Sequence, residues 1–294
     1  MKISSIVFSR NDGFKEDKRC LAHFLACLET FDEVVYVDWN SDEEKGSLLW
    51  RLEDRIPKTG KIKHIVIPPS AVERLATTED AFKVNETLTR NIGMVRSTGD
   101  WIVNTNIDII PPSRLELENF INKANKDTFY TVSRREAPLD VFNKYQAEEW
   151  KEFYTELSKT IPERHFPAKV TPNDKYSLIN CCGDFQLAHR DIWMKIKGFE
   201  EGMDKFCFID TNVQKKAVLA GFGLEVAYSP PLFHIEHGAY TITEDGEKEK
   251  SDKWHQNTKQ KKYNDAMKWV ENFQFTENRK DWGLSNTDIE IEIL

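Results

Sequence analysis

The chain has 294 residues, of which 39% are hydrophobic and 31% are charged, with a formal net charge of −8 and a pI near 5.5. This composition is typical of a globular protein with one large or two small domains and excludes a disordered chain. The negative charge argues against a general nucleic-acid-binding protein, which usually has a basic surface. An anionic ligand would therefore need local positive charge or a metal ion.

No apolar run approaches the roughly 18 residues that span a bilayer, and the chain begins directly with a strand-like segment, Lys2–Phe8. These features predict a cytoplasmic protein without a transmembrane segment, unless a targeting segment has been removed. The cysteines are odd in number and lack Cys-x-x-Cys spacing, which indicates buried free thiols in a reducing compartment and no zinc site. They are Cys20, Cys27, Cys181, Cys182 and Cys207.

The first half of the chain alternates between strand-like and helix-like segments. Strands are expected at residues 3–8, 33–38, 61–67, 101–105 and 128–133, and helices at 17–30, 43–52, 78–98 and 113–124. This alternation predicts an α/β fold with a mostly parallel central sheet and helices on both faces. Residues 137–176 show no clean period and predict a long loop.

The most informative segment runs from Arg90-Asn-Ile-Gly to Asp108. It predicts the end of a helix, a turn, a short apolar strand, and a polar-x-acid triplet, Asn106-Ile107-Asp108, where the strand stops. In an open α/β sheet, ligands bind at the carboxyl ends of the strands. An acid at that position can hold a hard divalent cation, which in turn can hold a diphosphate. Alternatively, Asn and Asp are common residues of ordinary strand-end turns.

Further motifs follow in the second half of the chain. Residues 182–193 form a Gly-x-Phe strand that ends in a basic pair and leads into a helix. Residues 198–201 read Gly-Phe-Glu-Glu, and residues 209–216 read Ile-Asp-Thr-Asn-Val-Gln-Lys-Lys before Gly221 ends the predicted helix. Several motifs in this order are far more specific than any one of them.

Over residues 1–240 these motifs resemble GT-A glycosyltransferases of family 2. The resemblance identifies 106–108 with the Asp-x-Asp metal-binding turn, with Asp108 as a metal ligand and Asn106 in place of the first acid. It therefore predicts that Asn106→Asp preserves or strengthens metal binding. Arg90, Asn106 and Ile107 are assigned to the nucleotide-binding residues.

Two segments near the N-terminus match the nucleotide-binding part of the resembled family. Val35–Ser41 resembles its second-strand Val-Asp-x-x-Ser, in which Asp38 would accept hydrogen bonds from the base or the ribose. Ser9 and Arg10 lie where the first loop of the family covers the nucleotide, and Arg10 could stack on the base or neutralise phosphate. The alternative for both segments is plain turn chemistry.

The resemblance also assigns catalytic roles. Asp210 occupies the position of the general base of inverting members, and Asp184 is a second candidate that would bind sugar hydroxyls. At the start of a helix the dipole is expected to keep the pKa of Asp210 low, so that it stays ionised and can accept a proton. The alternative is that Asp210 only caps the helix.

A late His in the resembled family often adds a metal ligand. His234 fits that pattern best in Leu232–Gly238, and His237 is the alternative. A neutral imidazole favours Mn²⁺, although Mg²⁺ also fits the carboxylate. Either histidine could instead be hydrogen-bonded for structural reasons.

The sequence thus predicts a catalytic domain over residues 1–240 and a C-terminal extension over 241–294 with an amphipathic helix at 254–273. The extension could pack on the sheet, close over the donor, or join two copies in a homo-oligomer; packing is favoured. The predicted reaction moves a sugar from a nucleoside diphosphate sugar, with UDP as the default nucleotide, to an acceptor hydroxyl on a glycan or another molecule, with inversion. The alternatives are a sugar-1-phosphate nucleotidyltransferase and a non-catalytic binding protein of the same fold.

Overall fold

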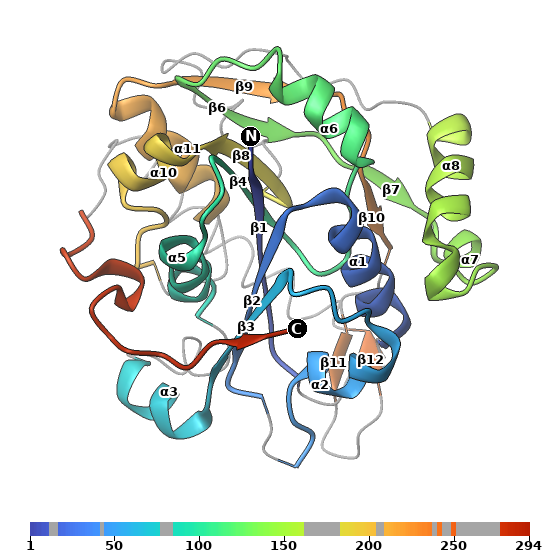
Figure 1. Cartoon of the computed structure of the whole chain (residues 1–294), viewed down its shortest axis with the longest axis horizontal. Coiled ribbons are helices and arrows are strands. Elements are labelled where there is room, and N and C mark those ends of the chain that lie inside the picture. Colours follow the sequence, from blue (N-terminus) through green and yellow to red (C-terminus); the bar gives the residue numbers. More distant parts are fainter. Residues whose placement is uncertain are drawn as a thin grey trace.

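The structure, a computed structural model, describes residues 1–11, 17–41, 44–76, 85–161, 183–203, 209–236, 240–242, 248–250 and 277–294. Its centre is an eight-stranded sheet with the order β13-β3-β2-β1-β4-β8-β6-β9 (Figure 1). The strands of this sheet are β1 (Ile3–Ser9), β2 (Glu33–Trp39), β3 (Ile62–Ile67), β4 (Trp101–Thr105), β6 (Thr128–Val132), β8 (Phe185–His189), β9 (Gly223–Ala227) and β13 (Glu292–Ile293).

Strand direction brings several strand ends to one edge of this sheet. Strands β3, β2, β1 and β4 are mutually parallel, whereas β8 runs antiparallel to β4 and pairs Phe185 with Thr105. The carboxyl ends of β1, β2 and β4 therefore share an edge with the amino end of β8. This is the edge where open α/β sheets bind ligands, and the mostly parallel sheet confirms the predicted fold class.

Helices cover both faces of the sheet, as predicted (Figure 1). One face carries α1 (Asp17–Thr30), α2 (Leu48–Leu52), α6 (Arg114–Ile121) and α8 (Trp150–Thr160). The other carries α3 (Pro69–Leu75), α5 (Glu86–Arg96), α10 (Arg190–Ile196) and α11 (Ile209–Leu219). Because the parallel strands are covered on both sides, β1, β2 and β4 are buried along most of their length, and each large apolar side chain there contributes about 1.5–3 kcal/mol.

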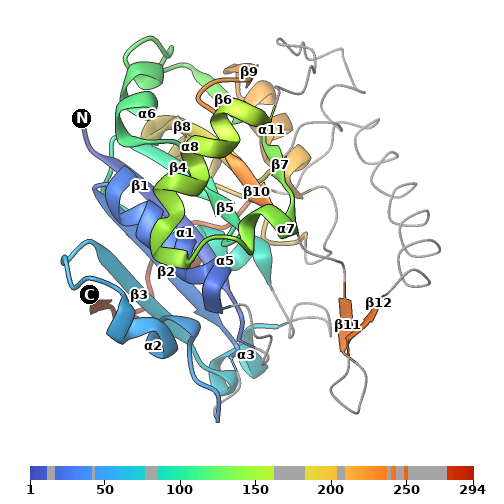
Figure 2. The ribbon, with the colours of Figure 1, turned by 90° about the vertical axis from the view of Figure 1, so that its right-hand side faces the viewer.

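A second sheet of three strands, with the order β5-β10-β7, lies beside the end of β4 (Figure 2). It consists of β5 (Ile109–Ile110), β10 (Phe233–Ile235) and β7 (Arg135–Ala137). The register places His234 opposite Ile109 on one side and Glu136 on the other. A late segment of the chain is thereby fixed next to Asp108.

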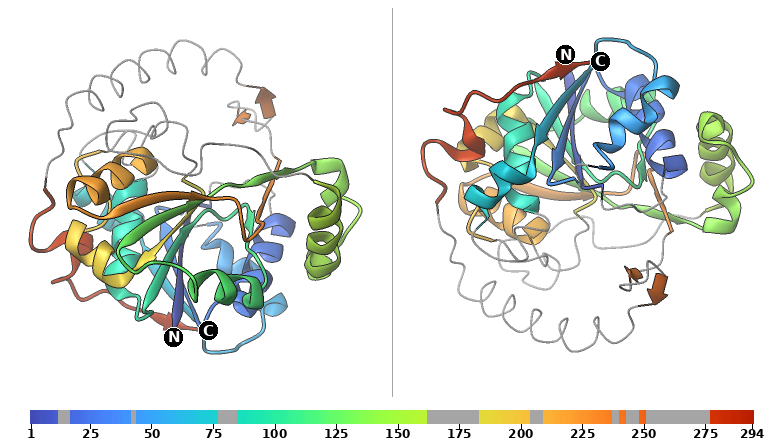
Figure 3. Two further views of the ribbon diagram at one scale, coloured as in Figure 1. Left: turned by 90° about the horizontal axis from the view of Figure 1, so that it is seen from above. Right: turned by 90° about the horizontal axis from the view of Figure 1, so that it is seen from below.

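The described C-terminal residues pack against the central sheet and α5. The short helix η3 (Trp282–Leu284) lies against α5, and Arg96 donates hydrogen bonds to the carbonyls of Gly283, Leu284 and Thr287. Strand β13 then pairs with β3, so both chain ends lie together at the edge opposite the strand ends described above (Figure 3). Residues 277–294 thus contact α5 and β3, whereas the helix predicted at 254–273 lies outside the described residues.

The remaining described elements are short. They are η1 (Glu53–Arg55), α7 (Leu139–Phe142), η2 (Ala147–Glu149), β11 (Tyr240–Ile242) and β12 (Lys248–Lys250), of which the last two form a hairpin. Within the described ranges, every helix is too short or too polar to cross a membrane.

Three predicted segments were wrong. The loop expected at 137–176 contains α7 and α8, and α8 buries Trp150, Phe153 and Leu157 at helical spacing. The helix expected at 43–52 begins only at Leu48, after the cap Ser47. Of the helix expected at 78–98, residues 78–84 lie outside the described residues, and α5 begins only at Glu86, after Asn85, whose side chain caps it by accepting from the backbone N–H of Leu88.

Candidate active site

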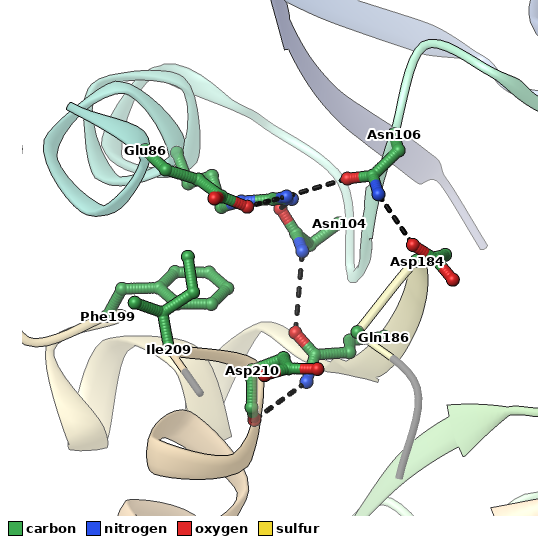
Figure 4. Close-up of a pocket in the computed structure, with 10 residues that line it drawn as sticks. Glu86, Asn104, Asn106, Asp184, Gln186, Phe199, Ile209 and Asp210 are labelled. Atoms are coloured by element: carbon green, nitrogen blue, oxygen red, sulfur yellow. Dashed lines mark hydrogen bonds and ion pairs between the residues drawn. The ribbon is translucent and has the colours of Figure 1, made fainter. Parts of the chain in front are cut away.

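A polar pocket of about 140 Å³ lies at the strand-end edge, between α5, the end of β4, the start of β8 and the start of α11 (Figure 4). Its lining is formed by Glu86, Arg90, Asn104, Asn106, Gly183, Asp184, Gln186, Phe199, Ile209 and Asp210. Four of the site residues predicted from the sequence therefore lie around one cavity: Arg90, Asn106, Asp184 and Asp210.

Arg90 is the buried cation of this pocket. It projects from α5, and its guanidinium donates to Glu86, to Oδ1 of Asn104 and to Oδ1 of Asn106, the last at 2.7 Å. The rings of Phe8 and Phe199 lie 4.7 and 5.5 Å from it, distances at which a guanidinium is attracted to an aromatic face. Arg90 is thus held rigidly by the protein itself.

Asn106 connects Arg90 to Asp184. Its Oδ1 accepts from Arg90, while its Nδ2 donates to Oδ1 of Asp184 at 2.6 Å. The other oxygen of Asp184 pairs with the guanidinium of Arg134, which also donates to Glu136 at 2.8 Å. Asn106 therefore uses both ends of its amide, and its Nδ2 faces the carboxylate.

A second group of side chains continues this chain of contacts to Asp108. Nδ1 of His234 lies 2.6 Å from Oε2 of Glu136, and Nε2 of His234 lies 3.4 Å from Oδ2 of Asp108. Burial alone would lower the pKa of His234, but the two carboxylates outweigh it and raise that pKa above its ordinary value. Burial alone would raise the pKa of Glu136, but His234 and Arg134 outweigh it and lower the pKa of this carboxyl below its ordinary value.

This geometry fits a divalent cation with two protein ligands. Two ligands of one octahedral ion at about 2.1 Å lie about 3 Å apart, close to the 3.4 Å between Asp108 and His234. Glu136 holds the other ring nitrogen, the arrangement that orients metal-binding histidines in proteins. The described residues contain no group of three or more His, Cys, Asp or Glu side chains that could hold a metal ion, so among them Asp108 and His234 are the two candidate ligands. His237, the alternative histidine, lies outside the described residues.

Asp210 lies in the first turn of α11, is half-buried, and lines the pocket. Its Oδ1 accepts from the backbone N–H of Thr211 at 2.9 Å. Gly183 packs directly on it: a Cβ at residue 183 would lie 2.2 Å from Cβ of Asp210. Burial raises the pKa of Asp210 to about 6, although the hydrogen bond to the helix start lowers it. The expectation of a low pKa was wrong, because removal from water outweighs the dipole at this depth.

Asp38 and the first loop lie together at the ends of β2 and β1. Asp38 is buried and accepts from Oγ of Ser41 at 2.6 Å, and burial raises the pKa of its carboxyl to about 6. Arg10 donates from Nε to the carbonyl of Asn40 at 3.1 Å. The hydroxyl of Ser9 lies 2.6 Å from that of Tyr36. Ile107, the middle residue of the triplet, is half-buried against the core.

Two residues of the Arg90-Asn-Ile-Gly segment, Asn91 and Gly93, contribute to packing between elements of the fold. Asn91 exchanges hydrogen bonds with the backbone of Phe199 at 2.8 Å in each direction and donates to Glu201. A Cβ at Gly93 would lie 2.6 Å from Ile6. These residues join α5 to β1 and to the 198–201 turn, and that turn places Phe199 in the pocket.

Four residues that complete the network were not identified from the sequence. They are Glu86, Asn104, Arg134 and Glu136, whose contacts are described above. Arg134 and Glu136 lie between the predicted strand at 128–133 and the region without periodicity at 137–176, so nothing in the local sequence indicated them. Cys20 and Cys27 are buried free thiols, as expected; the other three cysteines lie outside the described residues.

Comparison with protein-family models and with curated proteins gives no match. Solved structures are similar to the fold. The crystal structure of S. aureus TarS 1-349 has a TM-score of 0.50 at 14% identity, covering 80% of this chain and 60% of that one. The same protein in complex with UDP-GlcNAc has a TM-score of 0.51 at 16% identity, covering 83% and 63%.

A mannosyltransferase, PcManGT from Pyrobaculum calidifontis in complex with GDP-Man and Mn²⁺, has a TM-score of 0.47 at 17% identity, covering 83% of this chain and 58% of that one. The chain therefore spans less than two thirds of the solved chains it resembles. At these identities the TarS likeness concerns the fold, and this chain has a GT-A-like fold, as its motifs predicted.

Proposed function

We propose that the protein is a glycosyltransferase that transfers a sugar from a nucleoside diphosphate sugar to an acceptor hydroxyl. One observation carries the proposal. A carboxylate–imidazole pair suited to a divalent cation, Asp108 and His234, is linked through Glu136 and Arg134 to Asp184, which lines a pocket together with a half-buried acid, Asp210. In this proposal the metal, the diphosphate and the sugar all bind at one edge of the sheet.

In this proposal Asp108 and His234 would hold Mn²⁺ or Mg²⁺, which when bound neutralises the departing diphosphate. Asp38 accepts hydrogen bonds from the nucleoside, and Arg10, in the first loop, stacks on the base or neutralises phosphate. UDP is the favoured nucleotide on the strength of the sequence resemblance, with GDP and dTDP as the competitors in the assay below.

Asp210 is the proposed general base. The acceptor oxygen attacks the anomeric carbon, the bond from that carbon to the diphosphate oxygen breaks, and the acceptor proton passes to the carboxylate of Asp210. A single displacement of this kind inverts the anomeric centre. A pKa of about 6 keeps Asp210 mostly ionised at neutral pH and makes it a better proton acceptor than an ordinary Asp. Asp184 is less suited to this step, since Arg134 and Asn106 already engage both its oxygens.

Two assays test the proposal. Thermal shift with UDP, GDP and dTDP, each with and without Mn²⁺, should show stabilisation by at least one nucleotide, enhanced by the metal. Release of that nucleoside diphosphate from its sugar conjugates should then be lost in Asp210→Asn. Binding without any release would favour a non-catalytic binding protein. Asn106, Ile209 and Asn212 argue for this alternative, since each stands where the resembled family has an acid. Formation of a nucleotide sugar from a sugar phosphate would favour a nucleotidyltransferase.

A further inference from the structure

A row of polar side chains crosses three neighbouring strands of the central sheet, β2, β3 and β13 (Figure 1). The strand register places Tyr36 opposite His64, and His64 opposite Glu292. The rings of Tyr36 and His64 are buried and stack with their centroids 5.3 Å apart. Asp38 follows two residues after Tyr36 and therefore lies on the same face of β2. The row thus leads from the C-terminal strand to the strand that carries Asp38.

Glu292 determines which nitrogen of His64 carries the proton. Its Oε2 lies 3.1 Å from Nδ1 of His64 and accepts from the indole N–H of Trp50 at 3.0 Å. The hydrogen bonds from Trp50 and His64 lower the pKa of Glu292, so this carboxylate is ionised at neutral pH and can only accept. Burial outweighs Glu292 and lowers the pKa of His64, so the ring is neutral at that pH. Its one N–H is therefore on Nδ1, and Nε2 is a hydrogen-bond acceptor.

The buried hydroxyl of Ser47 lies on the other side of the His64 ring. It caps α2 by accepting from the backbone N–H of Leu49, and its Oγ lies 3.0 Å from Nε2 of His64. The same hydroxyl is within hydrogen-bonding reach of Asp38, and when it donates there it lowers the pKa of that carboxyl. A hydroxyl has one proton to donate, so His64 and Asp38 compete for it.

Resting on the proposed role of Asp38 in nucleoside binding, we infer that His64 and Ser47 are positioning residues for that acid. His64, held by Glu292, draws the hydroxyl proton of Ser47 to itself, and Asp38 keeps its capacity to accept from the nucleoside. Ser41 holds the carboxyl from the other side by donating to Oδ1 at 2.6 Å. Without an acceptor at Nε2, the Ser47 hydroxyl would turn to Asp38, since a carboxylate is a stronger acceptor than a neutral oxygen.

His64→Phe tests the inference, because it keeps a ring against Tyr36 and removes both ring nitrogens. Calorimetry with UDP and Mn²⁺ on the full chain should show about tenfold weaker binding, since the Ser47 hydroxyl then competes with the nucleoside for the Asp38 carboxylate. Adding Ser47→Ala to His64→Phe should restore most of the affinity, because the competing hydroxyl is gone. Unchanged affinity in His64→Phe, or a double variant that binds no better than His64→Phe, would overturn the inference and leave both residues with a packing role.

Glu292→Ala tests the part played by the C-terminal strand. Without this carboxylate the proton of His64 can move to Nε2, so UDP affinity should fall, although by less than in His64→Phe. Glu290→Ala is the matched control, because Glu290 is an exposed acid two residues earlier in the same segment. This variant should bind UDP like the wild-type protein. Equal losses in Glu292→Ala and Glu290→Ala would reduce the effect to net charge and overturn the inference.

Failure of the proposed function gives a different result. If UDP does not bind, or Asp38→Asn binds it like the wild-type protein, the nucleoside role of Asp38 is wrong. The ligand-free protein then tests the hydroxyl alone, by NMR titration of the Asp38 carboxyl carbon. The pKa of Asp38 should fall below its wild-type value of about 6 in His64→Phe, and return toward that value when Ser47→Ala is added. An Asp38 pKa that His64→Phe leaves unchanged would overturn the inference.

Discussion

Asn106 donates from its Nδ2 to Oδ1 of Asp184 at 2.6 Å, although 78 residues separate them in the sequence. An acid at position 106 would place two carboxylates within hydrogen-bond distance and remove the donor. Asn106→Asp should therefore weaken Mn²⁺-dependent UDP binding, the opposite of what the resemblance predicts. Calorimetry should show a larger loss for Asn106→Asp than for Asn106→Ala, which removes the contact without adding charge. Tighter binding by Asn106→Asp would contradict this prediction and agree with the resemblance instead.

Asp108 supplies the carboxylate of the proposed metal site. Asp108→Ala should abolish the effect of Mn²⁺ on UDP affinity, since His234 alone would remain as a protein ligand. Asp127→Ala, which changes an acid in the turn before β6, should behave like the wild-type protein. If Mn²⁺ still raises the UDP affinity of Asp108→Ala as in the wild-type protein, the metal does not bind at residues 106–108.

Glu136 orients His234 through the 2.6 Å contact to Nδ1. Loss of such a partner typically lowers metal affinity about 10–100-fold. Electron paramagnetic resonance titration of Mn²⁺ in the presence of UDP should show this loss in Glu136→Gln and a greater one in His234→Ala. Glu148→Gln, which changes an acid about half exposed on the surface, serves as the control. If both Glu136→Gln and His234→Ala bind Mn²⁺ with wild-type affinity, these residues have a structural role and do not take part in metal binding.

Asp210→Asn keeps the shape of the side chain but cannot accept a proton. Removal of a general base typically costs about 10²–10⁴-fold in rate, so kcat should fall in that range while donor affinity changes little. Glycosyl-transfer kinetics with the donor identified by the binding screen would measure both quantities. Turnover near the wild-type value would leave Asp210 with a structural role only and direct attention to Asp184.

The raised pKa of Asp210 also predicts how stability depends on pH. The acid titrates near pH 3.8 when unfolded and near pH 6 when folded, so ionisation destabilises the folded state as pH rises through this window. The penalty is absent below about pH 3.8 and complete above about pH 6, where it amounts to roughly 2–3 kcal/mol.

Urea unfolding of Asp210→Asn and wild-type protein at pH 4 and pH 8 measures this penalty. The stability of the variant relative to wild type should rise by roughly 2–3 kcal/mol between the two pH values. A difference that does not depend on pH would contradict the burial of an ionisable Asp210.

The sequence predicted the strands of the sheet well because their apolar runs are buried on both faces, as in β1 and β2. It failed for α8, whose buried Trp150, Phe153 and Leu157 have helical spacing but stand among charged residues. Local pattern also could not separate Arg90, which lines the pocket, from its neighbour Asn91, which holds the 198–201 turn.

The contacts of the site were beyond sequence reasoning for a different reason. Asn106 meets Asp184, and His234 meets Glu136, only because the two sheets bring distant segments together. The depth of Asp210 in the fold, which reverses the direction expected for its pKa, likewise depends on packing against Gly183.

The most direct test of the proposed function is a crystal structure of the protein with Mn²⁺ and UDP, with the metal located by anomalous scattering. The structure should place Mn²⁺ within bonding distance of Asp108 and His234, with the diphosphate completing its ligands and the nucleoside beside Asp38. A metal with neither Asp108 nor His234 as a ligand, or a nucleotide bound away from this edge of the sheet, would contradict the proposed function.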